Sequence, residues 1–162
     1  MTYSIWLVPS YGDKKYLNKI VNDLAKKYGA PKFSAHITVY SGITSLRKAK
    51  AAVQNLDSCK IKVCKTGIGQ SNYLWKTIFV KIKKDKNLGK IHKTLHAVLG
   101  TKYDFVPHIS LIYKNMDYST KRKIKNSLKI KKSFSFGGIV IIRSSKCVKD
   151  WKIMYKASLG AA

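Results

Sequence analysis

The segments His36-Ile37-Thr38-Val39-Tyr40 and His108-Ile109-Ser110-Leu111-Ile112-Tyr113 repeat one pattern at a spacing of 72 residues. Each places a histidine, an aliphatic residue and a hydroxyl residue in an apolar, β-prone run. Side chains alternate across a strand, so each histidine should share a face with the hydroxyl residue two positions later. The aliphatic residues between them should point into a core. We infer one site in which two imidazoles and two hydroxyls converge, a set suited to holding a phosphate group.

The rest of the chain is compatible with a duplication around these two segments. Apolar residues at strand and helix spacing predict the order strand, helix, strand, helix, strand twice. The internal repeat covers residues 2–70 and 74–142, and a closing strand follows at 149–157. The strands are expected at 2–8, 35–40 and 60–68, then at 76–83, 106–113 and 133–142. The helices are expected at 13–28, 44–56, 87–99 and 119–128, the last with Ser119 or Thr120 as its N-cap.

This order of elements indicates a single α+β domain, residues 1–162, with two lobes. Each lobe would be a small antiparallel sheet flanked by helices, and the two histidine strands would face each other across a central cleft. The 162 residues are a normal length for one domain. No low-complexity or Pro/Gly-rich linker divides the sequence.

Two histidines on opposing strands can act as the base and the acid of an in-line displacement at phosphorus. His36 and His108 are therefore the candidate catalytic pair. Thr38 and Ser110 would donate hydrogen bonds to the non-bridging oxygens, where negative charge develops. The seven acidic residues are scattered along the chain, so we expect neither a metal nor any other cofactor. The alternative is that each histidine is a packed or surface residue.

The composition is strongly basic, with 33 lysines and arginines against seven acidic residues and a formal net charge of +26. Such a field attracts anionic partners, and RNA or a nucleotide is the expected one. Only Arg47, Arg122 and Arg143 are arginines, the residue best suited to bidentate phosphate contacts. The lysines are spread over every segment, and genome composition explains them equally well. The charge therefore leaves an RNA partner open.

Cys59, Cys64 and Cys147 cannot all pair within one chain, so free thiols in a reducing compartment are the simplest expectation. A zinc site at Cys59 and Cys64 lacks a second pair of ligands. The sequence has no apolar run of membrane-spanning length and no secretory signal pattern. We expect a monomer without a membrane partner, located in the cytoplasm or, as an alternative, the nucleus.

Two further pairs of residues have both a functional and a packing explanation. His92 and His96 lie one helical turn apart, a spacing that can bind a metal, but no third ligand is apparent. Tyr73 and Trp75 could stack a nucleobase. For both pairs, packing or surface exposure is the more frequent role of such residues.

The paired His-x-(Thr/Ser) motifs resemble those of the 2H phosphoesterases, which share a duplicated bilobal, LigT-like fold. The chain looks most like the cyclic phosphodiesterases of ADP-ribose 1'',2''-cyclic phosphate and nucleoside 2',3'-cyclic phosphates. Residues 4–9 (SIWLVP) and 105–113 (FVPHISLIY) carry this closer similarity. The resemblance implies that Trp6 lines the substrate cleft and that Tyr113 helps to bind the phosphate. Strand parity turns Tyr113 away from the face of Ser110 unless the strand ends or bulges there, so a core role is the alternative for Tyr113, as it is for Trp6.

The motifs favour a metal-independent cyclic phosphodiesterase that hydrolyses a ribose cyclic phosphate to a monophosphate. By the resemblance, the phosphate would stay on the 2' side of nucleosides or the 1'' side of ADP-ribose. The alternatives are an enzyme that opens or ligates 2',5' linkages of RNA and a non-catalytic module that binds RNA ends. Two histidine motifs favour catalysis, because a pure binder could use lysine or arginine instead. The near-symmetric motifs do not say which histidine is the base.

Overall fold

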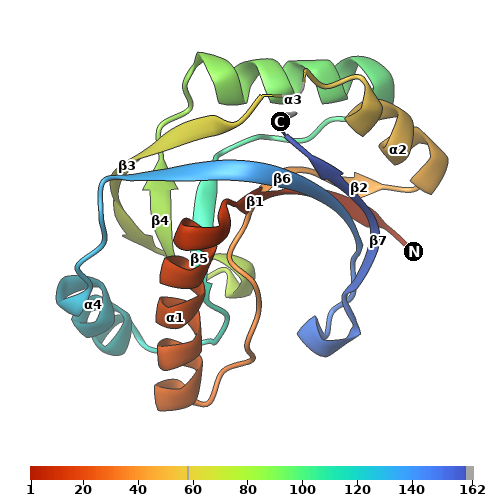
Figure 1. Cartoon of the computed structure of the whole chain (residues 1–162). Coiled ribbons are helices and arrows are strands. Elements are labelled where there is room, and N and C mark those ends of the chain that lie inside the picture. Colours follow the sequence, from red (N-terminus) through yellow and green to blue (C-terminus); the bar gives the residue numbers. More distant parts are fainter. Residues whose placement is uncertain (58, 160–162) are drawn as a thin grey trace.

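The computed structural model describes residues 1–57 and 59–159 (Figure 1). Within them the chain forms seven β-strands, four α-helices and two 3-10 helices. In chain order these are β1 (Tyr3–Pro9), α1 (Tyr11–Tyr28), β2 (Ile37–Ile43), α2 (Leu46–Gln54), β3 (Ile61–Gln70), η1 (Leu74–Lys76), β4 (Ile78–Ile82), α3 (Lys86–Leu99), β5 (His108–Ile112), α4 (Tyr118–Ser127), β6 (Ser133–Arg143), η2 (Val148–Asp150) and β7 (Lys152–Ser158). Every predicted strand and helix is present, with ends that differ by at most three residues. Residues 58 and 160–162 of the predicted domain lie outside the described residues.

The strands form one antiparallel path in the order β2-β1-β6-β3-β4-β5, with β7 paired to β6. Strand β3 joins the lobes, because residues 61–64 pair with β6, and residue 65 and residues 67–70 pair with β4. The predicted α+β fold is confirmed, and its two sheets are continuous through β3. The third strand of each sequence repeat crosses over, since β3 pairs with β4 and β6 pairs with β1. Each lobe therefore contains strands from both halves of the chain.

The helices pack against this curved sheet in two pairs. In the view of Figure 1, α2 and α3 lie side by side above the sheet, and α1 and α4 lie below it. Helix α1 ends at Gly29, which has a φ of 67°, and α3 ends at Gly100, which has a φ of 71°. Glycine adopts this left-handed conformation without steric cost. No helix within the described residues has the length and apolar character needed to cross a lipid bilayer.

The predicted cap of helix α4 is wrong by two or three residues. The carboxylate of Asp117 accepts a hydrogen bond from the backbone N–H of Thr120 at 3.0 Å. Neither Ser119 nor Thr120 is the N-cap, because both already lie within the helix. Aspartate satisfies a free N–H of the first turn and also faces the positive end of the helix dipole, so it is a strong competitor for this position.

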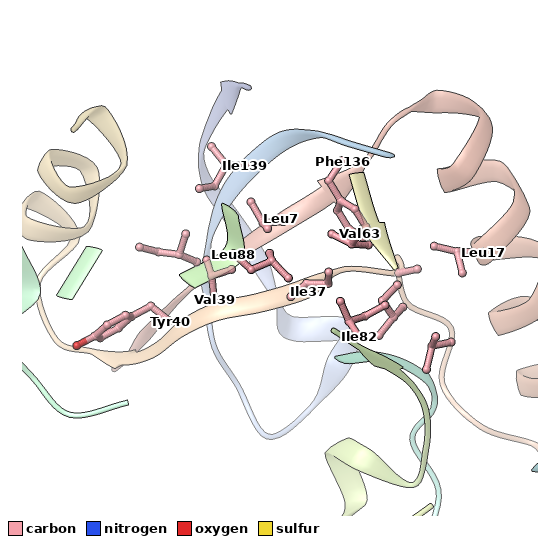
Figure 2. Close-up of a cluster of buried hydrophobic side chains, with 14 of the residues drawn as sticks. Leu7, Leu17, Ile37, Val39, Tyr40, Val63, Ile82, Leu88, Phe136 and Ile139 are labelled. Carbon is pink, nitrogen blue, oxygen red and sulfur yellow. The ribbon is translucent and has the colours of Figure 1, made fainter. Parts of the chain in front are cut away.

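The core confirms the alternation predicted for the two histidine strands. Ile37 and Val39 of β2, and Ile109 and Leu111 of β5, are completely buried. Figure 2 shows the first two within a cluster that also includes Leu7, Leu17, Val63, Ile82, Leu88, Phe136 and Ile139. The apolar face of each histidine strand is thus locked in the core, and this fixes the direction of the opposite face.

Substitution of Phe136 tests the packing at the junction between the lobes. It is completely buried in β6, where it pairs with Pro9 of β1 and Ile61 of β3. Phe136→Ala should lower the free energy of unfolding by about 3–5 kcal/mol, because it removes buried apolar surface and leaves a cavity. Ser135→Ala, at the exposed neighbouring position, should change it by less than about 0.5 kcal/mol. Urea unfolding measures both values, and equal effects of the two substitutions would contradict this packing.

Candidate active site

A cavity of about 570 Å³ opens between the lobes and brings together the site residues expected from the sequence. Six of them line it: Trp6, His36, Thr38, His108, Ser110 and Tyr113. Trp6 belongs to β1, His36 directly precedes β2, and Thr38 lies within β2. The other three belong to β5 and to the residue directly after it. The two motifs therefore face one space from two different parts of the sheet.

The two histidines are held in the same way. Nδ1 of His36 lies 2.7 Å from the carbonyl oxygen of Ser34, and Nδ1 of His108 lies 2.8 Å from that of Val106. A carbonyl oxygen only accepts, so each Nδ1 carries a hydrogen and donates it. In the neutral rings Nε2 is then the proton acceptor. Each ring can exchange a proton with a bound group through this nitrogen.

His36 is the more buried histidine, with 7% of its surface exposed. Its ring stacks on Trp6 with 3.5 Å between the ring centroids and 6° between the planes. Burial lowers the pKa of His36 to about 4, the bond to the Ser34 carbonyl partly opposes this, and the charge of His108 adds to it. His36 is therefore neutral at neutral pH, which is the state that a general base needs.

His108 is half-buried, and Lys76 lies near it. The ring of Phe79 meets the ring of His108 edge-on, with 5.5 Å between centroids. Burial lowers the pKa of His108, the bond to the Val106 carbonyl opposes this, and the charge of Lys76 adds to it. The two imidazoles thus share one hydrogen-bond pattern but differ in their surroundings.

Tyr113 reaches the cleft because β5 ends at Ile112, the condition that strand parity required. It is also packed, with 5% of its surface exposed and its ring stacked on Phe33 at 3.9 Å between centroids. Burial raises the pKa of its hydroxyl, and a hydrogen bond with the Ser110 side chain partly opposes this. The hydroxyl therefore stays protonated and able to donate. Tyr113 is thus both a packed core residue and part of the cleft lining.

All three tryptophans of the sequence line the cleft. The ring of Trp151 lies 5.2 Å from that of Trp6 and 5.7 Å from that of Trp75, measured between centroids. Trp75 belongs to η1, between β3 and β4, and Trp151 follows η2, between β6 and β7. Tyr73 lines the cleft as well. The sequence assigns Trp151 only to the closing strand, because its spacing does not show that the loop before it folds over the cleft.

The remaining candidates do not line the cleft. His92 and His96 lie on α3 with 6.3 Å between their ring centroids, and the Tyr40 hydroxyl is 3.2 Å from Nδ1 of His96. Over residues 1–57 and 59–159, no three His, Cys, Asp or Glu side chains gather as a metal site would need. The cysteines are exposed free thiols: Cys59, Cys64 and Cys147. Both histidines pack against aromatic rings. Between ring centroids, His92 lies 5.2 Å from Phe105 and 5.5 Å from Tyr40, and His96 lies 6.5 Å from Tyr40.

Two antiparallel lobes with a His-x-(Thr/Ser) motif on each side of a cleft define the class of 2H phosphoesterases. The family model for cyclic phosphodiesterase-like proteins matches residues 1–159. The chain therefore belongs to this family, as its two histidine motifs predict. Among curated proteins, none matches the sequence.

Solved structures share the fold at low sequence identity. Escherichia coli LigT in complex with 3'-AMP has a TM-score of 0.63 at 12% identity, over 98% of each chain. TT0787 of Thermus thermophilus has a TM-score of 0.66 at 15% identity, over 98% of each chain. Usb1 of Kluyveromyces marxianus has a TM-score of 0.52 at 10% identity, over 99% of this chain and 98% of that one. The LigT-like fold implied by the motifs is confirmed.

His36 should make the stability of the fold depend on pH. Its pKa of about 4 in the folded chain lies below the ordinary value of 6.5, so the unfolded chain takes up the proton first as the pH falls. The contribution of His36 to the free energy of unfolding is therefore fully present above pH 6.5. It falls by about 3 kcal/mol as the pH is lowered to 4. His36→Gln cannot titrate and should remove this part of the pH dependence. Urea unfolding at several pH values measures the difference, and parallel curves for both proteins would show that His36 is not buried as described.

Proposed function

We propose that this chain is a metal-independent cyclic phosphodiesterase that hydrolyses a ribose cyclic phosphate to a monophosphate. The observation that carries the proposal is the histidine pair, which lines one cleft from two strands with Nδ1 of each ring tied to a carbonyl. In-line displacement at phosphorus needs a proton acceptor and a proton donor on opposite sides. The described residues that line the cleft include no Asp, Glu or Cys, and this donor set suits histidine acid–base chemistry.

In the proposed mechanism His36 is the base. Its neutral Nε2 takes a proton from a water molecule while the water oxygen bonds to phosphorus. The imidazolium of His108 is the acid and gives a proton to the ribose oxygen while the bond from phosphorus to that oxygen breaks. Different surroundings for two titratable groups are the usual basis of such a division, and His36 is the more buried one. A bound phosphate anion would favour the protonated form of His108.

Thr38, Ser110 and Tyr113 are the proposed donors to the phosphate oxygens. Ser110 Oγ donates to the carbonyl oxygen of Trp75 at 2.7 Å, so it must rotate before it can donate to phosphate. Trp6 is a positioning residue, because its stacking holds the ring of His36. The hydroxyls and the two imidazoles together would surround one phosphorus atom.

The proposed substrates are ADP-ribose 1'',2''-cyclic phosphate or a nucleoside 2',3'-cyclic phosphate. A cavity of about 570 Å³ falls within the usual size range of small-molecule sites. The indole rings along it, Trp6, Trp75 and Trp151, suit stacking against a nucleobase. LigT, which has the same fold, has been solved with 3'-AMP bound.

The net charge of +26 supports a second candidate, an RNA-directed function. The chain would then open or ligate 2',5' linkages of RNA, or bind RNA ends without turnover. Turnover of 2',5'-oligoadenylate in preference to cyclic nucleotides would support the first form. Tight RNA binding without turnover of any cyclic phosphate would support the second.

Substitution of the two histidines tests the leading proposal. His36→Ala and His108→Ala should each lower kcat on nucleoside 2',3'-cyclic phosphates by about 10²–10⁴-fold, because each removes one proton transfer. Thr38→Ala and Ser110→Ala should lower it less, because each removes one hydrogen bond of several. His96→Ala is the matched control, since His96 does not line the cleft, and it should keep wild-type kcat. Near-normal turnover in either of the first two variants would end the proposal.

A substrate with an aryl leaving group distinguishes the proposed role of His108 as the acid from that of His36 as the base. p-Nitrophenolate leaves phosphorus without needing a proton. On bis(p-nitrophenyl) phosphate, His108→Ala should therefore stay within about tenfold of wild-type kcat/KM, whereas His36→Ala should still lose about 10²-fold or more. Release of p-nitrophenolate is followed by absorbance. The opposite pattern would show that the two roles are exchanged.

A further inference from the structure

Few charged side chains line the cleft. Among the side chains of its described lining residues, the lysines are Lys76 and Lys146, and none is a carboxylate. Lys146 is exposed, whereas Lys76 is half-buried and lies near His108. No described residue of the cleft lining has a carboxylate that could pair with the ammonium group of Lys76 in place of a bound phosphate.

We propose that Lys76 binds the phosphate of the substrate in this cleft and offsets the negative charge that develops on it during the reaction. The inference rests on the proposed function, and it adds a charged residue that neither histidine motif contains. Lys76 transfers no proton in the proposed reaction.

An aromatic ring holds the Lys76 ammonium group in place. Nζ of Lys76 lies 4.7 Å from the centroid of the Phe79 ring, a cation–π contact. The same ring touches His108 edge-on at 5.5 Å between centroids. Phe79 thus supports the lysine and the histidine at once, and this places both beside the same part of the cleft.

Gly69 makes room for this ring. Gly69 of β3 pairs directly with Phe79 of β4. A Cβ at Gly69 would lie 2.4 Å from Cζ of Phe79, so any side chain at this position would displace the ring. The missing side chain lets the ring lie over the neighbouring strand, which is a known way of covering a strand glycine.

The backbone of Lys76 is fixed from the other side. Lys121 of α4 is buried, and its Nζ donates to the carbonyl of Ser71 at 3.0 Å and to Oδ1 of Asn72 at 2.7 Å. Ser71 in turn donates through Oγ to the carbonyl of Lys76. The backbone N–H of Lys76 donates to the carbonyl of Tyr73 at 2.9 Å. The loop that carries Lys76 is therefore ordered before any ligand binds, as an effective charge clamp requires.

The chemistry of phosphate explains why a cation is needed here. A cyclic phosphate diester has one negative charge, and attack by water adds a second to the equatorial oxygens. Thr38, Ser110 and Tyr113 are neutral donors and share this charge without cancelling it. An ammonium group in a partly desolvated cleft stabilises the added charge more than it stabilises the ground state. Its charge also makes the His108 imidazolium a stronger acid.

The test compares Lys76→Met with Lys76→Arg and with Lys84→Met. Lys84 is exposed and lies outside the cleft lining, and its Nζ lies 5.5 Å from the Phe105 centroid, so Lys84→Met removes a similar cation–π contact elsewhere. Lys76→Met should lower kcat/KM for nucleoside 2',3'-cyclic phosphates by about 10–100-fold, the usual effect of losing one charged hydrogen bond. Lys76→Arg should recover most of the loss, and Lys84→Met should match wild type.

Binding of inorganic phosphate gives a readout that does not depend on turnover. All three tryptophans line the cleft, so their fluorescence should report binding. Lys76→Met should weaken phosphate binding by about tenfold or more. NMR titration should also show a higher pKa for His108 in this variant, because a nearby positive charge is gone.

The outcomes separate the two proposals. If wild type hydrolyses no cyclic phosphate but binds phosphate more tightly than Lys76→Met, the proposed reaction fails and the role of Lys76 in phosphate binding stands. If wild type hydrolyses cyclic phosphates and Lys76→Met matches it in kcat/KM and in phosphate affinity, the role of Lys76 is overturned alone. Absence of saturable phosphate binding by wild type would overturn the role of Lys76 too.

Discussion

The hydrogen bond from Nδ1 of each cleft histidine to a carbonyl two residues upstream decides what the cleft can do. It places one proton on Nδ1 and leaves Nε2 to exchange the other, in both rings alike. The bond can form in both places because each ring stands at the start of a strand whose next residue, Ile37 or Ile109, is completely buried. Because side chains alternate along a strand, a slip of register by one residue would remove both the aliphatic residues from the core and the motif residues from the cleft.

The surroundings of the two rings are much less symmetric than their hydrogen bonds. His36 is enclosed and stacked on an indole, whereas His108 is half-buried beside Phe79 and within the field of Lys76. Two similar motifs supply two similar rings, but a directional reaction needs two different proton affinities. Trp6, Phe79 and Lys76 lie outside both histidine motifs. The difference in surroundings between the two rings therefore comes from residues that the repeated pattern does not contain.

Local pattern was enough to predict the elements and the direction of the motif side chains. Alternation along a strand predicted that His36 shares a face with Thr38 and that His108 shares a face with Ser110. It also made the position of Tyr113 depend on where β5 ends. Contacts between distant segments could not be predicted in this way. The crossing of β3 and β6 between lobes, the return of Trp151 over the cleft and the fit of Phe79 on Gly69 depend on tertiary packing. The cap of α4 was missed for a local reason, because Asp117, Ser119 and Thr120 are all good cap residues.

The most direct test of two-histidine hydrolysis is phosphorus NMR of the purified protein in excess EDTA. The substrates are ADP-ribose 1'',2''-cyclic phosphate and the four nucleoside 2',3'-cyclic phosphates. Conversion of at least one to a single monophosphate, at the same rate with and without EDTA, is the expected result. Complete loss of turnover in EDTA, restored by a divalent cation, would contradict a mechanism in which His36 and His108 make both proton transfers without a metal.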